Sequence, residues 1–207
     1  MSLATRTGIV AFLFTDIEGS TRLWEQNPET MRAALKAHDA IAKAAVNGHH
    51  GSVVKFLGDG IHASFDDPLD ALEATLGIQL ALADSRATGG IQLKVRCGLH
   101  IGFVEYRDND FFGSAVNRAA RIMGTAHGGQ VLISHAVAVL IDGRLPADVS
   151  LRDLGRVRLR DLADPEHVYQ VLHRDLRREF RPTALRGETA RSDETPGRQV
   201  RPHAATN

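Results

Sequence analysis

The stretch GIVAFLFTDIEGST, residues 8–21, predicts a buried strand that ends in a polar turn and a helix. The apolar run over residues 8–15 is continuous, which is typical of a strand buried on both faces. Asp16 follows this run, and the polar residues 19–21 mark the start of a helix. A carboxylate at such a junction is either a helix-capping acid or a metal ligand.

Helix and strand signals continue along the chain. A tight hairpin is predicted at Gly58-Asp59-Gly60, between strand-like runs over residues 52–57 and 61–65. Further strands are expected over residues 91–106, 131–133, 149–154, 157–159 and 167–172, and helices over residues 28–48, 67–84, 113–124 and 134–141. This order predicts an α+β fold in which helices pack on one face of a mostly antiparallel sheet.

The composition is that of an ordinary globular protein without excess charge. The 207 residues include 25 Lys and Arg and 25 Asp and Glu, so the formal net charge is zero. This balance argues against binding to nucleic acid or to an anionic membrane, because both kinds of binding need an excess of basic residues. The single cysteine, Cys97, excludes an internal disulfide framework and a Cys-rich zinc site. No apolar run is long enough to span a bilayer and no signal-peptide layout is present, so we expect a cytoplasmic protein.

The composition changes near residue 176. Residues 1–175 are expected to form one domain, whereas residues 177–207 contain seven Arg and few large apolar side chains. Such a segment cannot bury enough surface to offset the entropy lost on ordering. We therefore expect residues 176–207 to be a polar, Arg-rich tail that is disordered or acts as a linker.

Two carboxylates stand at turns that the fold can bring together. Asp59 lies at the tip of the predicted hairpin, where it is either a turn residue or a ligand. If the first strand pairs beside this hairpin, Asp16 and Asp59 emerge at the same end of the sheet. Two carboxylates at one place repel each other unless a cation lies between them, and Mg²⁺ prefers carboxylates together with substrate phosphates. The pair therefore indicates a candidate metal site.

Two further patterns place polar side chains on otherwise apolar elements. Strict alternation in the strand before the hairpin puts Val53 and Lys55 on one face, where a lysine either extends to solvent from an edge strand or meets a partner. In the helix that follows Gly113, Asn117 and Arg121 are four positions apart and share one face. That face is either solvated or offers donors to an anion.

Three motifs together resemble the catalytic domain of class III adenylyl and guanylyl cyclases, most closely that of bacterial, actinobacterial-type adenylyl cyclases. They are FTDIEGST at 14–21, KFLGDG at 55–60 and DFFGSAVNRAAR at 110–121, and the resemblance extends over roughly residues 8–173. It implies a ferredoxin-like βαββαβ core with extra C-terminal strands. It also implies a head-to-tail homodimer with active sites at the interface.

The resemblance implies a role for each residue of the candidate site. Two divalent cations, Mg²⁺ or Mn²⁺, would bind Asp16, Asp59 and the backbone carbonyl of Ile17. Asn117 would orient the ribose, and Arg121 would stabilise charge on the α-phosphoryl group in the transition state. The candidate phosphate-binding residues are Gly19, Ser20, Thr21, Arg107 and Arg160. Arg160 stands where the family usually has a lysine.

Lys55 and Asp110 are implied to read the base. Adenine presents an acceptor at N1 and a donor at N6, which a lysine and a carboxylate match, whereas guanine presents the reverse. Family members that use GTP typically carry Glu and Cys at these positions. We therefore expect an adenylyl cyclase that converts ATP to 3′,5′-cyclic AMP and pyrophosphate by attack of the ribose 3′-hydroxyl on the α-phosphorus. The alternatives are a guanylyl cyclase and a catalytically silent nucleotide-binding domain that regulates a partner.

Overall fold

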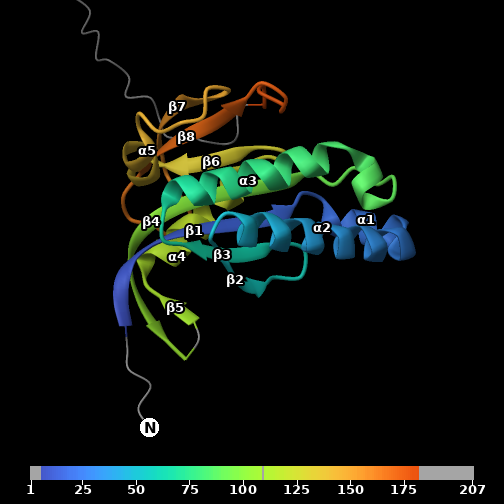
Figure 1. Ribbon diagram of the computed structural model, residues 1–207, viewed down its shortest axis with the longest axis horizontal. Coiled ribbons are helices and arrows are strands. Elements are labelled where there is room, and N and C mark those ends of the chain that lie inside the picture. The colour runs from blue at the N-terminus through green and yellow to red at the C-terminus, as the bar shows by residue number, and fades with distance from the viewer. Residues whose placement is uncertain (1–5, 109, 182–207) are drawn as a thin grey trace, which may run out of the picture.

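The apolar run near the start of the chain forms β1 (Arg6–Ile17), an internal strand of the sheet (Figure 1). In this computed structural model, which describes residues 6–108 and 110–181, β1 pairs antiparallel with β3 (Ile61–Phe65) and with β4 (Val95–Arg107). Both long edges of β1 are therefore hydrogen-bonded to neighbouring strands.

The side chains of β1 alternate between two buried faces, as the geometry of a strand requires. Ala11 and Leu13 belong to one core cluster, whereas Phe12 and Phe14 belong to another. Each of these four side chains is buried. The prediction of a strand buried on both faces is confirmed.

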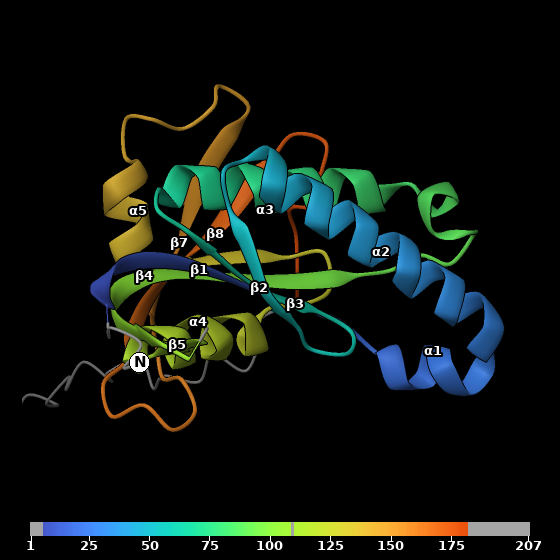
Figure 2. The ribbon, with the colours of Figure 1, turned by 60° about the horizontal axis from the view of Figure 1, so that its bottom comes forward.

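Helices cover both faces of the sheet (Figure 2). They are α1 (Ser20–Gln26), α2 (Pro28–Gly48), α3 (Pro68–Ala83), α4 (Ser114–Thr125) and α5 (His135–Ile141). Residues of α2, α3 and α5 share the core cluster of Leu13, whereas α4 packs Ala115 and Ala119 against Phe12 and Phe14 on the opposite face. The expectation that all helices lie on one face is therefore wrong. The sheet is apolar on both faces, and each apolar face needs a cover.

The strand order identifies the core. The remaining strands are β2 (Ser52–Phe56), β5 (Asp110–Phe112), β6 (Val131–Ser134), β7 (Val149–Val157) and β8 (Glu166–His173). The order is β2-β3-β1-β4-β6-β8-β7, and β5 pairs with β4. Among the described residues, the β4–β6 pairing is the one parallel pairing. β2-β3-β1-β4 with α2 and α3 form the ferredoxin-like βαββαβ core, which the later strands extend, so the predicted α+β fold is confirmed.

Several element boundaries differ from the sequence prediction, and the main differences concern β4, β5 and β7. β4 begins at Val95 rather than at residue 91. β5 has no counterpart among the predicted elements, since so short a strand carries little pattern. The two strands expected over residues 149–159 form one strand, β7, whose register is irregular around Gly155, a residue with a φ of 74° that suits glycine.

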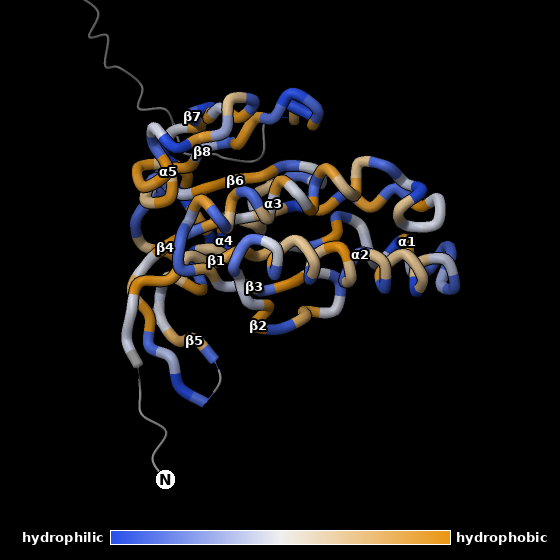
Figure 3. Tube along the Cα trace, viewed as in Figure 1, coloured by the Kyte–Doolittle hydropathy of each residue, from blue (hydrophilic) through white to orange (hydrophobic). Residues whose placement is uncertain are grey.

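Hydrophobic residues concentrate in the interior strands, and the hairpin tip between β4 and β5 is hydrophilic (Figure 3). β6, for example, is buried along its whole length. None of the helices in the part of the chain that the structure describes is long and apolar enough to cross a membrane.

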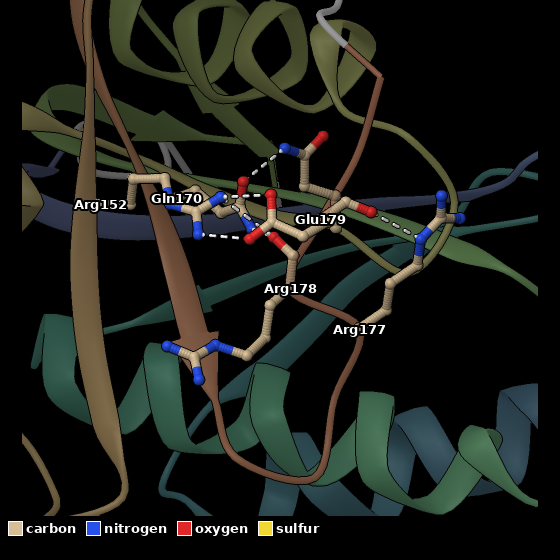
Figure 4. A network of polar contacts seen from close by, with 6 residues as sticks. Arg152, Gln170, Arg177, Arg178 and Glu179 are labelled. Carbon is tan, nitrogen blue, oxygen red and sulfur yellow. Dashed lines mark hydrogen bonds and ion pairs between the residues drawn. The ribbon is translucent and has the colours of Figure 1, made fainter.

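The chain that follows β8 folds back onto the domain (Figure 4). Gln170 Nε2 donates a hydrogen bond to the carbonyl oxygen of Arg178 at 2.8 Å, and Arg152 Nη2 lies 2.7 Å from Glu179 Oε1. Residues 176–181 of the expected tail thus contact the domain. The rest of that tail lies outside the described residues.

Candidate active site

Asp59 lies in the short loop between β2 and β3, and this loop packs on the end of β1. The amide of Ile17 donates to the backbone carbonyl oxygen of Asp59 at 3.1 Å. Gly60 follows in the loop, where a Cβ would lie 1.9 Å from the carbonyl oxygen of Thr15. Glycine at this position therefore lets the hairpin approach the strand end that carries Asp16.

Asp16 and Asp59 form a pair of carboxylates with two polar partners. The Asp16 carboxyl is half-buried, and this burial raises its pKa, Arg96 lowers the pKa, and the neighbouring Asp59 raises it. Arg96 Nη2 lies 2.6 Å from Asp16 Oδ2, and the hydroxyl of Ser20 donates to Asp59 Oδ2. We call Asp16, Asp59, Ser20 and Arg96 the carboxylate group. The prediction that the two aspartates emerge at one end of the sheet is confirmed.

Arg96 is a residue of this site that the sequence did not indicate. It stands directly opposite Asp16 in the antiparallel β1–β4 ladder, although 80 positions separate the two residues. Directly paired residues of neighbouring strands hold their side chains close together on one face of the sheet. The strand register creates this ion pair, and no local pattern reveals that register.

The carboxylate group suits a hard divalent cation. Mg²⁺ and Mn²⁺ prefer carboxylate and carbonyl oxygens, which Asp16, Asp59 and the backbone of Ile17 can supply. The raised pKa of Asp16 reflects a half-buried negative charge beside a second carboxyl group, and positive charge there favours the ionised form. The guanidinium of Arg96 provides one such charge. The residues present therefore fit the cations that the sequence predicts, and their assignment as ligands stays a prediction.

Lys55, Asp110 and Asn117 line one pocket of about 220 Å³, which we call the Lys55 pocket. They come from β2, β5 and α4, and Phe14 and His62 contribute to the walls. Lys55 Nζ lies 2.6 Å from Asp110 Oδ2, and this hydrogen bond lowers the pKa of the Asp110 carboxyl. The structure therefore brings together the two residues expected to read the base and the residue expected to orient the ribose.

A β-bulge in β2 decides which face Lys55 occupies. Val53 pairs with Ala63, and Lys55 pairs with His62, so the register shifts by one residue between the two pairs. Directly opposite residues point to the same face, which puts Val53 on the face of α2 and α3 and Lys55 on the face of α4. The expectation that Val53 and Lys55 share a face is wrong, because the bulge adds one residue to the strand.

Arg121 and Arg160 meet at one carboxylate. Arg121 Nη2 lies 2.8 Å from Asp161 Oδ2, and Arg160 Nε lies 3.6 Å from the same oxygen. Their side chains are 44% and 85% exposed, so both guanidinium groups are accessible to a ligand. On α4, Arg121 is one helical turn from Asn117. We call the set Lys55, Asp110, Asn117, Arg121 and Arg160 the α4 group.

The remaining candidate phosphate ligands do not join the α4 group. Arg107 lies in the β4–β5 hairpin, where Nε is 3.7 Å from Glu105 Oε1 and the guanidinium stacks 4.3 Å from the Phe112 ring centre. Gly19 adopts a φ of 73° at the start of α1, and Thr21 is exposed. Their roles toward phosphate stay predictions.

The carboxylate group and the α4 group have separate networks of polar contacts. Among residues 6–108 and 110–181, no hydrogen bond or ion pair links a member of one group to a member of the other. Figure 2 shows α1, which begins beside the carboxylate group, at one end of the molecule and α4 beneath the sheet.

Comparisons with known proteins identify the family of this chain. The family model of the adenylate and guanylate cyclase catalytic domain matches residues 3–173. An uncharacterized protein of Mycobacterium tuberculosis is 40% identical over 191 residues, which cover 91% of this chain. The chain spans 63% of the length of that relative.

Solved structures show the same fold. A structure of adenylate cyclases from Trypanosoma brucei in their monomeric state has 29% identity and a TM-score of 0.74, and the match covers 86% of this chain and 93% of that one. An adenylate/guanylate cyclase/hydrolase from Silicibacter pomeroyi has 29% identity and a TM-score of 0.72, over 81% of this chain and 98% of that one. The chain therefore belongs to the family of adenylate and guanylate cyclase catalytic domains.

Proposed function

We propose that the chain is an adenylyl cyclase that converts ATP to 3′,5′-cyclic AMP and pyrophosphate. The observation that carries this proposal is the contact of Lys55 Nζ with Asp110 Oδ2, at 2.6 Å, in a pocket that Asn117 also lines. N1 and N6 are adjacent on one edge of adenine, so a donor and an acceptor held side by side match that edge. Guanine presents a donor and an acceptor in the opposite order. The lysine donor would then face a donor, and the carboxylate acceptor would face an acceptor.

The other members of the α4 group act on the sugar and the phosphates. Asn117 orients the ribose, and Arg121 stabilises negative charge that develops on the α-phosphoryl group. Arg160, next to Arg121 at Asp161, holds the triphosphate. A guanidinium forms two parallel hydrogen bonds to phosphate oxygens, which a lysine ammonium does not.

The carboxylate group serves the attacking hydroxyl and the leaving group. Mg²⁺ or Mn²⁺ held by Asp16 and Asp59 would lower the pKa of the ribose 3′-hydroxyl and neutralise triphosphate charge. Arg96 pairs with Asp16 at 2.6 Å and would hold this carboxylate in place for such a cation. The hydroxyl of Ser20 keeps the Asp59 carboxylate in place.

A complete site needs both groups, and we propose that two chains supply them. The resemblance of the three motifs to class III cyclases supports a head-to-tail homodimer, in which the carboxylate group of one protomer faces the α4 group of its partner. Two-fold symmetry then creates two equivalent sites at one interface.

The test is turnover of ATP and of GTP by the purified chain with Mg²⁺ or Mn²⁺. We expect cyclic AMP formation from ATP with a kcat/KM well above that for cyclic GMP formation from GTP. A preference for GTP would make the chain a guanylyl cyclase and would contradict the reading of Lys55 and Asp110. Nucleotide binding without turnover in either metal would identify a silent regulatory domain.

A further inference from the structure

We propose that His62 is a third residue that binds the purine, donating a hydrogen bond to a ring nitrogen that ATP and GTP share. The inference rests on the proposed function, because it assigns a ligand contact within the same pocket. His62 would increase the affinity for any purine nucleotide, whereas Lys55 and Asp110 would distinguish adenine from guanine.

The strand register places His62 in the Lys55 pocket. On β3, His62 stands opposite Phe14 of β1 on one side and opposite Lys55 of β2 on the other. These three side chains therefore form one row across the sheet, on the face that α4 covers. The bulge in β2 brings Lys55 into this row, so the same irregularity that aims the lysine also places it beside the imidazole.

The ring of His62 is held rigidly. The residue is 2% exposed, and its ring stacks on Phe14 with centroids 4.3 Å apart and planes 17° apart. A second ring, that of Phe12, lies 5.4 Å away. These contacts fix the ring before a ligand binds. Little conformational entropy of this side chain is therefore lost on binding.

His62 has an unused hydrogen-bonding atom. Its Nε2 is buried and has no hydrogen-bond partner among the described residues. A buried polar atom without a partner destabilises the folded state by about 1–3 kcal/mol, so such atoms are few in folded proteins. In a ligand pocket, the ligand can supply the missing partner.

The chemistry of the imidazole limits what it can bind. Burial, with a contribution from the charge of Lys55, lowers the pKa of His62 to about 4, so the ring is neutral near pH 7. A neutral imidazole carries one N–H donor. Lys55 and Asp110 occupy the edge at N1 and N6, and N7 is an acceptor in both adenine and guanine. An N–H donor toward a ring nitrogen therefore strengthens binding of both nucleotides.

The experiment measures binding of 3′-deoxy-ATP and 3′-deoxy-GTP, which lack the attacking hydroxyl, by calorimetry in the presence of Mn²⁺. His62→Phe keeps the stacking on Phe14 and removes both ring nitrogens. We expect the Kd for each nucleotide to rise about 3–10-fold, which corresponds to one neutral hydrogen bond. His62→Gln, whose amide reaches the position of Nε2, should restore part of the affinity. With ATP as substrate, KM should rise in His62→Phe while kcat changes little.

The control is His100→Gln. His100 is also buried, but it contacts Ser134 Oγ at 2.8 Å and does not line the Lys55 pocket. Its variant should bind both nucleotides as the unmodified chain does. If circular dichroism shows that His62→Phe is unfolded, the nucleotide affinities of His62→Gln and His62→Ala are compared instead. Equal affinities of these two variants would overturn the proposal.

Three outcomes distinguish a failure of the role of His62 from a failure of the proposed function. An unmodified chain that makes cyclic AMP, with an unchanged Kd in His62→Phe, overturns the role of His62 and leaves the proposed function intact. A loss confined to one nucleotide overturns the assignment to a shared ring nitrogen. An unmodified chain that binds neither nucleotide overturns the proposed function and this inference together.

Discussion

Lys55 Nζ lies 2.6 Å from Asp110 Oδ2, although the two residues are 55 positions apart and come from strands that do not pair with each other. β2 is an edge strand, and β5 is a short strand paired with β4. Their ion pair forms on the face that α4 covers, beside Asn117. A fixed donor next to a fixed acceptor is the feature on which the proposed choice of ATP depends.

The first prediction concerns the base. Lys55→Glu combined with Asp110→Cys should lower kcat/KM for ATP far more than for GTP, because the altered pair no longer matches N1 and N6 of adenine. Buried mismatches of donors and acceptors discriminate by about 10⁴ in well-packed sites. This pocket is partly open, so we expect a change in the ATP:GTP ratio of about 10²–10³. An unchanged ratio of kcat/KM values would show that these residues do not read the base.

The second prediction concerns the cations. Asp16→Asn or Asp59→Asn should reduce turnover at saturating Mn²⁺ at least about 100-fold, because each removes a charged oxygen ligand and several kcal/mol of transition-state stabilisation. The folded state should persist, since asparagine has nearly the same shape. The check is cyclic AMP formation together with circular dichroism.

Direct Mn²⁺ binding gives a second measurement of the same prediction. Ligand atoms of His49, Asp70 and Glu73 lie within 4.8 Å of one another elsewhere on the surface and could bind added metal. The titration is therefore made with His49→Ala and Glu73→Ala present in every sample. In that background, Asp59→Asn should bind less Mn²⁺ than the chain with an intact Asp59. Equal binding and full activity would refute the assignment of the metal ligands.

The third prediction concerns the shared interface. Asp59→Ala and Arg121→Ala should each be nearly inactive, with a loss of about 10²–10³ for the arginine, by analogy with other charge-stabilising donors. After equal amounts are mixed and subunits exchange, about half of the dimers contain one copy of each variant. In those dimers one site carries both changes and the other carries neither.

Roughly a quarter of the activity of the unmodified chain should therefore return on mixing. The measurement is cyclic AMP production after exchange has been verified with differently tagged chains. No recovery after verified exchange would mean that each chain builds its own site.

The fourth prediction concerns acid. Burial lowers the pKa values of His62 and His100 to about 4, below the 6.5 of an unperturbed histidine. Between these values the unfolded chain binds more protons than the folded one, so the free energy of unfolding falls as the pH falls from about 6.5 to about 4. From pH 7 to pH 5 each histidine should account for a loss of about 2 kcal/mol.

Urea unfolding at pH 7 and pH 5 measures this loss. His62→Gln and His100→Gln should each show a smaller difference between the two pH values than the unmodified chain, by about 2 kcal/mol. The same difference in all three proteins would show that other groups cause the acid sensitivity.

The fifth prediction concerns the segment after β8. Leu176 packs against the core cluster of Leu13, and Arg178 and Glu179 accept hydrogen bonds from Gln170 and Arg152. A chain that ends at residue 175 should therefore be less stable than one that ends at residue 181, by about 1–3 kcal/mol. Thermal and urea unfolding of the two chains compare them directly. Equal stability would show that these contacts do not contribute to folding.

Local patterns in the sequence are enough to predict much of the fold. The apolar run over residues 8–15 forms β1, the Gly58-Asp59-Gly60 turn joins β2 and β3, and Pro68 opens α3. These signals depend on the few residues around each position, which is why one sequence reveals them. The same holds for the family motifs, which identify the candidate residues but not their contacts.

Other features depend on residues far apart in the chain, and the tertiary structure decides them. The bulge in β2 turns Lys55 to the face of α4, against the strict alternation that the sequence suggests. The register of β1 with β4 places Arg96 opposite Asp16. α4 covers the second face of the sheet because that face is also apolar. Strand register and the face that a helix covers depend on how well surfaces from distant parts of the chain pack together. A local sequence pattern contains no information about that packing.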